Sequence, residues 1–88
     1  MKSAFALDLK NSNAYAKQAN FVRLGILKDK LEDDDVTVKM AELLLVAIES
    51  NDNVQVKRRA QSLLDYLDIQ YEGIELLIRK ALNELINI

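Results

Sequence analysis

Residue types that commonly carry chemistry are scarce in this chain of 88 residues, which contains no Cys and no His. Thiolate nucleophiles, imidazole bases, disulfides and the usual zinc ligands are therefore missing. The two Gly residues are 48 positions apart, so they cannot form a Gly-rich phosphate loop. Glu72 and Glu75 could pair as general acid and base only in a cleft, for which so short a chain has little room. We expect no catalytic, cofactor-binding or metal-binding residues, and a protein that is not an enzyme.

Three consecutive aspartates, Asp33 to Asp35, form the acidic cluster that most resembles a cation site. A calcium loop needs a Gly at its turn and a closing Glu at fixed spacing, and this stretch has neither. Carboxylates at a helix start accept hydrogen bonds from free N–H groups and suit the positive end of the helix dipole. The cluster therefore predicts the N-terminal cap of a helix.

Charge is distributed unevenly along the chain, although the net charge is only -2. Residues 1–30 carry six basic and two acidic side chains, whereas residues 31–53 carry seven acidic and one basic. A basic segment of this kind could contact nucleic acid, but the acidic segment argues against a dominant phosphate-binding role. We favour the interpretation that these charges lie on solvated helix faces of one compact body.

Apolar residues recur at a period near 3.6, which predicts an all-α fold: a small bundle of about four helices joined by short polar turns, in one domain over residues 1–88. The absence of Pro favours long, uninterrupted helices. We expect helices at about 14–31, at 36–49, from a cap at Asn53 to a corner at Asp68, and at about 71–87.

The first residues behave differently. Phe5, Leu7 and Leu9 alternate with polar or small residues, the period of a strand, yet no second strand is predicted. Residues 1–12 are therefore either an arm that adds to a partner or a short helical turn that packs on the bundle. We favour the helical turn, because terminal segments follow their tertiary context.

Apolar stripes predict which residues form the core. The segment 36–49 is apolar on every face in its second half, so we expect it to be the central and most buried helix, with Leu44 and Leu45 in the core. Gly25 inside the first helix suggests a close helix crossing. The inward residues expected on the other helices are Tyr15, Ala19, Val22, Ile26, Val56, Ala60, Leu63, Leu64, Leu67, Ile74, Leu77, Ile78, Ala81, Leu82 and Leu85.

Several apolar residues exceed what one core requires. The first helix has a second apolar face, the last helix carries a Leu opposite its inward stripe, and apolar residues continue to the terminus. Clustered surplus apolar surface is typical of an interface. The predicted partner-binding residues are Phe21, Leu24, Leu27, Leu76, Ile86 and Ile88.

A second interpretation is a DNA-binding regulator. Residues 60–80, with the expected corner at Asp68, resemble a generic helix-turn-helix, but the turn lacks the customary Gly and the second helix opens with acidic residues. The residues that would contact nucleic acid are Lys57, Arg58, Arg59, Arg79 and Lys80.

The sequence thus favours a small non-enzymatic interaction module, a regulator, inhibitor or assembly component, which associates with itself or docks on another protein; the DNA-binding regulator is the alternative.

No apolar run approaches the 18 or so residues of a membrane span, and no signal-peptide core is recognisable, so we expect a cytoplasmic protein. A composition rich in Lys, Asn, Asp and Ile is associated with AT-rich genomes and with bacteriophage or plasmid products.

Overall fold

The computed structural model of the protein describes residues 15–88 and confirms the all-α fold. Our expectations for residues 1–12 lie outside the described part. Within it, four α-helices and one short 3-10 helix follow each other along the chain: α1 (Ala16–Lys28), η1 (Leu31–Asp33), α2 (Asp35–Glu49), α3 (Asn53–Gln70) and α4 (Leu76–Ile86).

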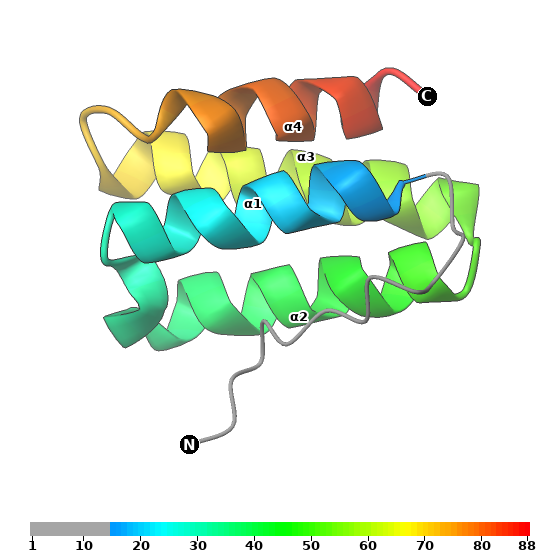
Figure 1. Ribbon diagram of the computed structural model, residues 1–88, viewed down its shortest axis with the longest axis horizontal. Helices are drawn as coiled ribbons and strands as arrows, with labels where there is room; N and C mark the ends of the chain where they lie inside the picture. Colours follow the sequence, from blue (N-terminus) through cyan, green and yellow to red (C-terminus); the bar gives the residue numbers. More distant parts are fainter. Residues whose placement is uncertain (1–14) are drawn as a thin grey trace.

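The four helices form an up-and-down bundle in which consecutive helices run in opposite directions (Figure 1). Each helix contacts the next one along the chain, and α4 returns to pack along α1. α2 and α4 are not neighbours, so these two helices occupy diagonal corners of the bundle. Short connections between antiparallel neighbours are the usual way in which such bundles are built.

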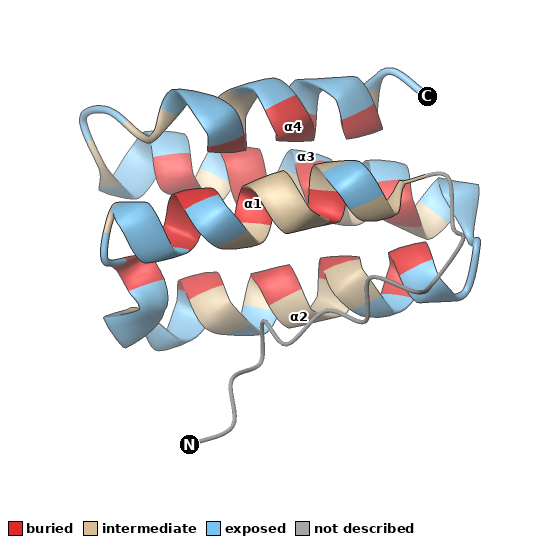
Figure 2. Ribbon diagram, viewed as in Figure 1, coloured by how far each residue is buried: buried red, intermediate tan, exposed pale blue. Residues whose placement is uncertain are grey.

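The buried residues form one continuous core to which all four helices contribute (Figure 2). The stripe predicted for α3 is confirmed in full, since all five of its residues are buried. On α1 and α4 the expected inward residues are also buried, apart from Tyr15, Ile74 and Leu77, of which the first two are half-buried and pack against the core. The largest fully buried side chains are Ile26, Leu44, Ile48, Leu63, Leu67, Ile78, Leu82 and Leu85.

The prediction that the helix at 36–49 is the central element is wrong. α2 occupies a corner of the bundle like the other helices, and Val46 on its outer side is 59% exposed. Leu44 is fully buried, as predicted, but Leu45 is only partly buried. In a bundle of four helices each helix turns one face outward, so a helix that is apolar all round exposes part of its apolar surface.

α1 and α2 both end at a residue in the left-handed conformation, Lys30 (φ 59°) and Asn51 (φ 55°). Lys30 N donates to Leu27 O (3.1 Å), and Asn51 N donates to Ile48 O (3.1 Å). These bonds satisfy carbonyls of the last helical turn, as in a Schellman motif. The left-handed residue ends α1 at Lys28, three residues before the predicted end.

The connection between α3 and α4 also differs from the prediction. α3 continues through the expected corner at Asp68 to Gln70, and α4 begins only at Leu76, because the intervening segment is extended from Tyr71 onward. Two tertiary contacts hold this segment out of a helix: the Tyr71 hydroxyl donates to Asp34 (2.5 Å), and Glu75 N donates to Asp29 Oδ2 (2.6 Å).

The helix caps are partly as predicted. Asp34 caps α2, with one carboxylate oxygen accepting from Val36 N (3.0 Å) and Thr37 N (3.2 Å), which confirms the interpretation of the aspartate cluster. The cap of α3 is Asp52, which accepts from Gln55 N (3.2 Å), and not Asn53, which is the first helical residue.

Candidate interaction surface

Apolar side chains of α1 and α4 meet on one outer side of the bundle. Leu24 of α1 and Leu76 and Leu77 of α4 are exposed, and Phe21 of α1 is half-buried. Gly25 packs against Ile78, so their chain neighbours Leu24 and Leu77 lie at the same level of the two helices. We call the set of Phe21, Leu24, Leu76 and Leu77 the α1–α4 surface.

A groove of about 340 Å³ runs between the two helices at this surface. Phe21, Leu77 and Ala81 supply its apolar lining, while Lys17 and Lys80 lie at its edges. The Lys17 ammonium is 6.0 Å from the centre of the Phe21 ring, which places a cation over an aromatic face. Gln18 and Glu84 complete the lining, so the groove combines apolar side chains with two ammonium groups and one carboxylate.

Polar contacts tie α1 to α4 near both ends of this helix pair. Gln18 Nε2 donates to Glu84 Oε1 (2.7 Å), and Lys28 Nζ lies 3.5 Å from Glu75 Oε1. These contacts fix the relative position of the helices whose side chains form the surface.

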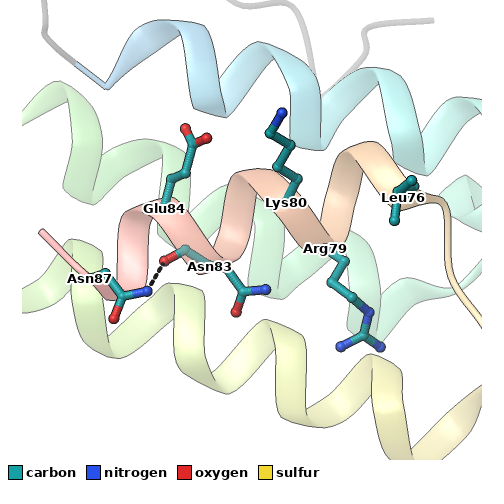
Figure 3. Close-up of a pocket in the computed structure, with 6 residues that line it drawn as sticks. All are labelled: Leu76, Arg79, Lys80, Asn83, Glu84 and Asn87. Atoms are coloured by element: carbon teal, nitrogen blue, oxygen red, sulfur yellow. Dashed lines mark hydrogen bonds between the residues drawn. The ribbon is translucent and has the colours of Figure 1, made fainter.

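The outer side of α4 continues this surface as an open strip of about 600 Å³ (Figure 3). Lys80 and Glu84 point toward α1, whereas Arg79 and Asn83 point toward α3. All the lining residues belong to one helix and the residue after it, so they cannot enclose a ligand. Small-molecule sites bury most of their ligand, and this strip suits a macromolecular contact better. The strip is lined by Leu76, Arg79, Lys80, Asn83, Glu84 and Asn87.

The structure places the predicted partner-binding residues unevenly. Leu76 is 72% exposed, and Leu24 and Leu27 are exposed on successive turns of α1. Ile86 packs against the core, so it does not extend the surface to the terminus as expected, and Ile88 is exposed at the end of the chain.

Leu77 was missed, because sequence reasoning assigned it to the inward stripe of the last helix. It is 37% exposed and lines the groove beside Phe21. Its helical position lies at the edge of the buried face, between Ile78 and the outermost residues. Only the position of α1 decides whether such a boundary residue is covered.

The basic residues of the DNA-binding interpretation fall into two separate sets. Lys57 and Arg58 are exposed near the start of α3, and Arg59 is half-buried beside α2. Arg79 forms an ion pair with Asp68, which lies nine residues after Arg59 and so about 14 Å further along α3. The corner expected at Asp68 is absent, and α3 and α4 are antiparallel neighbours (Figure 1).

Asp34 is the centre of a polar cluster that sequence reasoning only partly found. Besides its capping bonds, its carboxylate accepts from the Tyr66 hydroxyl (3.0 Å) and the Tyr71 hydroxyl (2.5 Å). The Tyr71 bond, with further bonds from Thr37 and Tyr66, lowers the pKa of Asp34 to about 2 against the opposing effect of burial. The bond to Asp34 raises the pKa of Tyr71, and burial chiefly raises that of Tyr66. General acid–base groups work best with a pKa near the working pH, and the pKa values in this cluster are shifted away from neutral pH. The cluster is therefore better suited to joining α2, α3 and the turn before α4.

The other acidic residues that could do chemistry are engaged or exposed. Glu72 and Glu75 lie in the turn before α4 and not on a helix, and Glu75 pairs with Lys28. Among residues 15–88, no three acidic side chains lie close enough together to hold a metal ion.

Comparisons of the chain with protein-family models, with curated proteins and with solved structures find no match. Within the described helices, none has both the length and the apolar character needed to cross a membrane.

Proposed function

We propose that the protein is a non-enzymatic helical interaction module that binds another protein chain through the α1–α4 surface. The observation that carries this proposal is the cluster of exposed apolar side chains on two helices that are held together at both ends. Leu24, Leu76 and Leu77 are exposed there beside the half-buried Phe21. A single exposed Leu needs no explanation, whereas a cluster with a polar rim is typical of a protein interface.

The form of the surface also favours a protein partner. Its groove lies between two antiparallel helices, and its lining combines Phe21, Leu77 and Ala81 with the charged groups of Lys17, Lys80 and Glu84. An amphipathic helix of a partner can place its apolar face in such a groove. A regulator, inhibitor or assembly component acts through contacts of this kind and needs no catalytic group.

Two substitutions at the surface and one matched control test the proposal. Leu24→Asp and Leu76→Asp introduce a charge into the α1–α4 surface, and Ile69→Asp introduces the same charge at the end of α3, where Ile69 is 79% exposed. A tagged copy is purified from the cells that make it, and the proteins that remain bound are identified, including further copies of the chain.

We expect wild type and Ile69→Asp to retain the same bound protein, and both surface variants to lose it while keeping a helical circular dichroism spectrum. Equal binding by all four forms would refute the α1–α4 surface as the site. Loss of helical structure in Leu24→Asp and Leu76→Asp would show that these residues stabilise the fold instead.

A further inference from the structure

A second exposed apolar face lies on α2, outside the α1–α4 surface. Val36 and Val46 are 47% and 59% exposed, and Leu43 between them is half-buried. These residues follow each other at helical spacing on the outward side of α2. We call the side of α2 that carries them the α2 outer face.

Acidic residues accompany this face along its whole length. Asp35, Glu42 and Glu49 are spaced seven residues apart, so they form a line along the helix. Among residues 15–88, no basic side chain forms an ion pair with these three carboxylates. Lys39 is also exposed on this side of α2, between Val36 and Leu43 at the same helical spacing, so the α2 outer face carries three carboxylates and one ammonium group of α2.

The two faces carry opposite charge. α1 contains three basic and no acidic side chains, and α4 contains two basic and one acidic. The stretch 31–49, which covers η1 and α2, contains six acidic and one basic. The groove at the α1–α4 surface is lined by two cations, Lys17 and Lys80, and one carboxylate, Glu84. The α2 outer face has three carboxylates along it and two cations, Lys39 of α2 and Arg59 of α3, which lines the same hollow as Leu43 and Val46. The first surface is therefore net basic and the second net acidic.

From these observations, and on the basis of the proposed function, we infer that the α1–α4 surface of one copy binds the α2 outer face of a second copy. Because α2 and α4 occupy diagonal corners, one copy can use both surfaces at the same time (Figure 1).

Such a contact is heterologous, since the two copies contribute different surfaces. A two-fold symmetric contact through the α1–α4 surface would instead place two copies of the same net-basic surface against each other, and like charges across an interface are unfavourable. Heterologous contacts produce chains or closed rings, so the associated mass should grow beyond two copies as the concentration rises.

The experiment uses two charge-reversed variants of the full chain. Lys17→Glu with Lys80→Glu reverses the groove rim and leaves α2 intact; Glu42→Lys with Glu49→Lys reverses the α2 border and leaves the groove intact. Each is studied by sedimentation velocity at rising concentration, alone and in an equimolar mixture, with helicity checked by circular dichroism.

We expect wild type to grow in mass with concentration and each variant alone to stay at the mass of one chain, 10.0 kDa. In the mixture both kinds of contact regain opposite charges, because the reversed groove of one variant meets the reversed α2 border of the other, so the mixture should associate and grow in mass with concentration. Salt at about 0.5 M should weaken the wild-type association, since it screens exposed charges.

Lys57→Glu with Arg58→Glu is the matched control for the groove variant, because both pairs of substitutions lower the net charge by four; it lies on the exposed side of α3 and should leave the association unchanged. If a charge reversal lowers helicity, Leu24→Asp replaces it as the variant that blocks the α1–α4 surface, and Val46→Asp as the variant that blocks the α2 outer face. Three results would each overturn the inference. They are a wild-type protein that stays at the mass of one chain, a charge-reversed variant that still associates when studied alone, and a mixture of the two variants that forms no complex. A monomeric wild type that loses a different partner through Leu76→Asp would leave the proposed function standing.

Discussion

Gly25 of α1 and Ile78 of α4 pack so closely that a Cβ atom at position 25 would lie 2.2 Å from Ile78 Cγ1 and 3.3 Å from Ile78 N. The backbone contact means that the two helices would have to separate to admit a side chain. The close crossing suggested by Gly25 in the sequence is thus confirmed, and Ile78, which is fully buried, is its partner.

Gly25→Ala should lower the free energy of unfolding, although Ala favours a helix over Gly by about 1 kcal/mol. Overpacking against Ile78 costs about 1 to 3 kcal/mol and exceeds that gain. Gly73→Ala is the matched control, because nothing lies within 4 Å of its added Cβ, and it should be neutral or slightly stabilising. Urea unfolding of both variants measures the difference, and a Gly25→Ala variant more stable than wild type would contradict the close crossing.

Asp34 should remain ionised well below the pH at which an ordinary aspartate titrates. Hydrogen bonds from Tyr71 above all, and also from Thr37 and Tyr66, lower its pKa from the usual 3.8 to about 2. A pKa lowered in the folded state means that the ionised form stabilises the fold; this stability is present above about pH 4 and is lost as the pH falls toward 2.

Tyr71→Phe should raise the pKa of Asp34 toward its ordinary value, and Tyr66→Phe should raise it less, because the Tyr71 bond has the larger effect. A pH titration of the Asp34 carboxyl carbon by NMR measures both changes. Titration of wild-type Asp34 near its ordinary value would show that the cluster does not form in solution.

Lys30→Gly should stabilise the protein by about 1 kcal/mol, since Lys30 has a φ of 59° and only Gly adopts that conformation without steric cost. At this chain length the melting temperature should rise by about 4 to 8 °C. Lys39→Gly, in the interior of α2, should instead destabilise by about 1 kcal/mol. Thermal melts that move both variants in the same direction would show that Lys30 is not left-handed.

Leu44→Ala should cost about 2 to 5 kcal/mol, because Leu44 is fully buried in the core. Leu45→Ala should cost clearly less, since Leu45 is only partly buried. The two substitutions remove the same atoms from neighbouring positions of α2, so urea unfolding compares burial alone. Equal losses would mean that α2 is turned differently about its axis.

DNA binding should be weak and indifferent to sequence. At about 150 mM salt, fluorescence anisotropy should show no complex tighter than the micromolar range of non-specific contacts. The basic residues of α3 and α4 are separated along the bundle, and Arg79 is engaged by Asp68. Nanomolar, sequence-selective binding that Arg58→Ala and Arg59→Ala abolish would establish the DNA-binding interpretation in place of the protein-binding one.

Local sequence signals predicted much of the architecture. The helical period identified the buried stripe of α3 completely, and the aspartate cluster identified the cap of α2 through Asp34. Both features depend on residues close to each other in the chain. Gly25 signalled a close crossing, but its partner Ile78 became known only when the helices were placed together.

The errors arose where a distant contact overrides the local pattern. Tyr71 and Glu75 fit a helical period, yet bonds to Asp34 and Asp29 hold them in an extended turn. Leu77 lies at the border of a buried face, so only the position of α1 determines its exposure. The roles of Phe21, Leu24, Leu27, Leu76, Ile86 and Ile88 in binding stay predictions.

The most direct test of the central claim is site-specific photo-crosslinking in the cells that make the protein, with a photoreactive phenylalanine analogue at position 76 or, as the control, at position 69. Both native side chains are largely exposed and apolar, at 72% for Leu76 and 79% for Ile69. We expect position 76 to give a discrete crosslinked protein, either a partner or a second copy, and position 69 to give none. Crosslinks from position 69 with none from position 76 would contradict the assignment of the α1–α4 surface as the binding site.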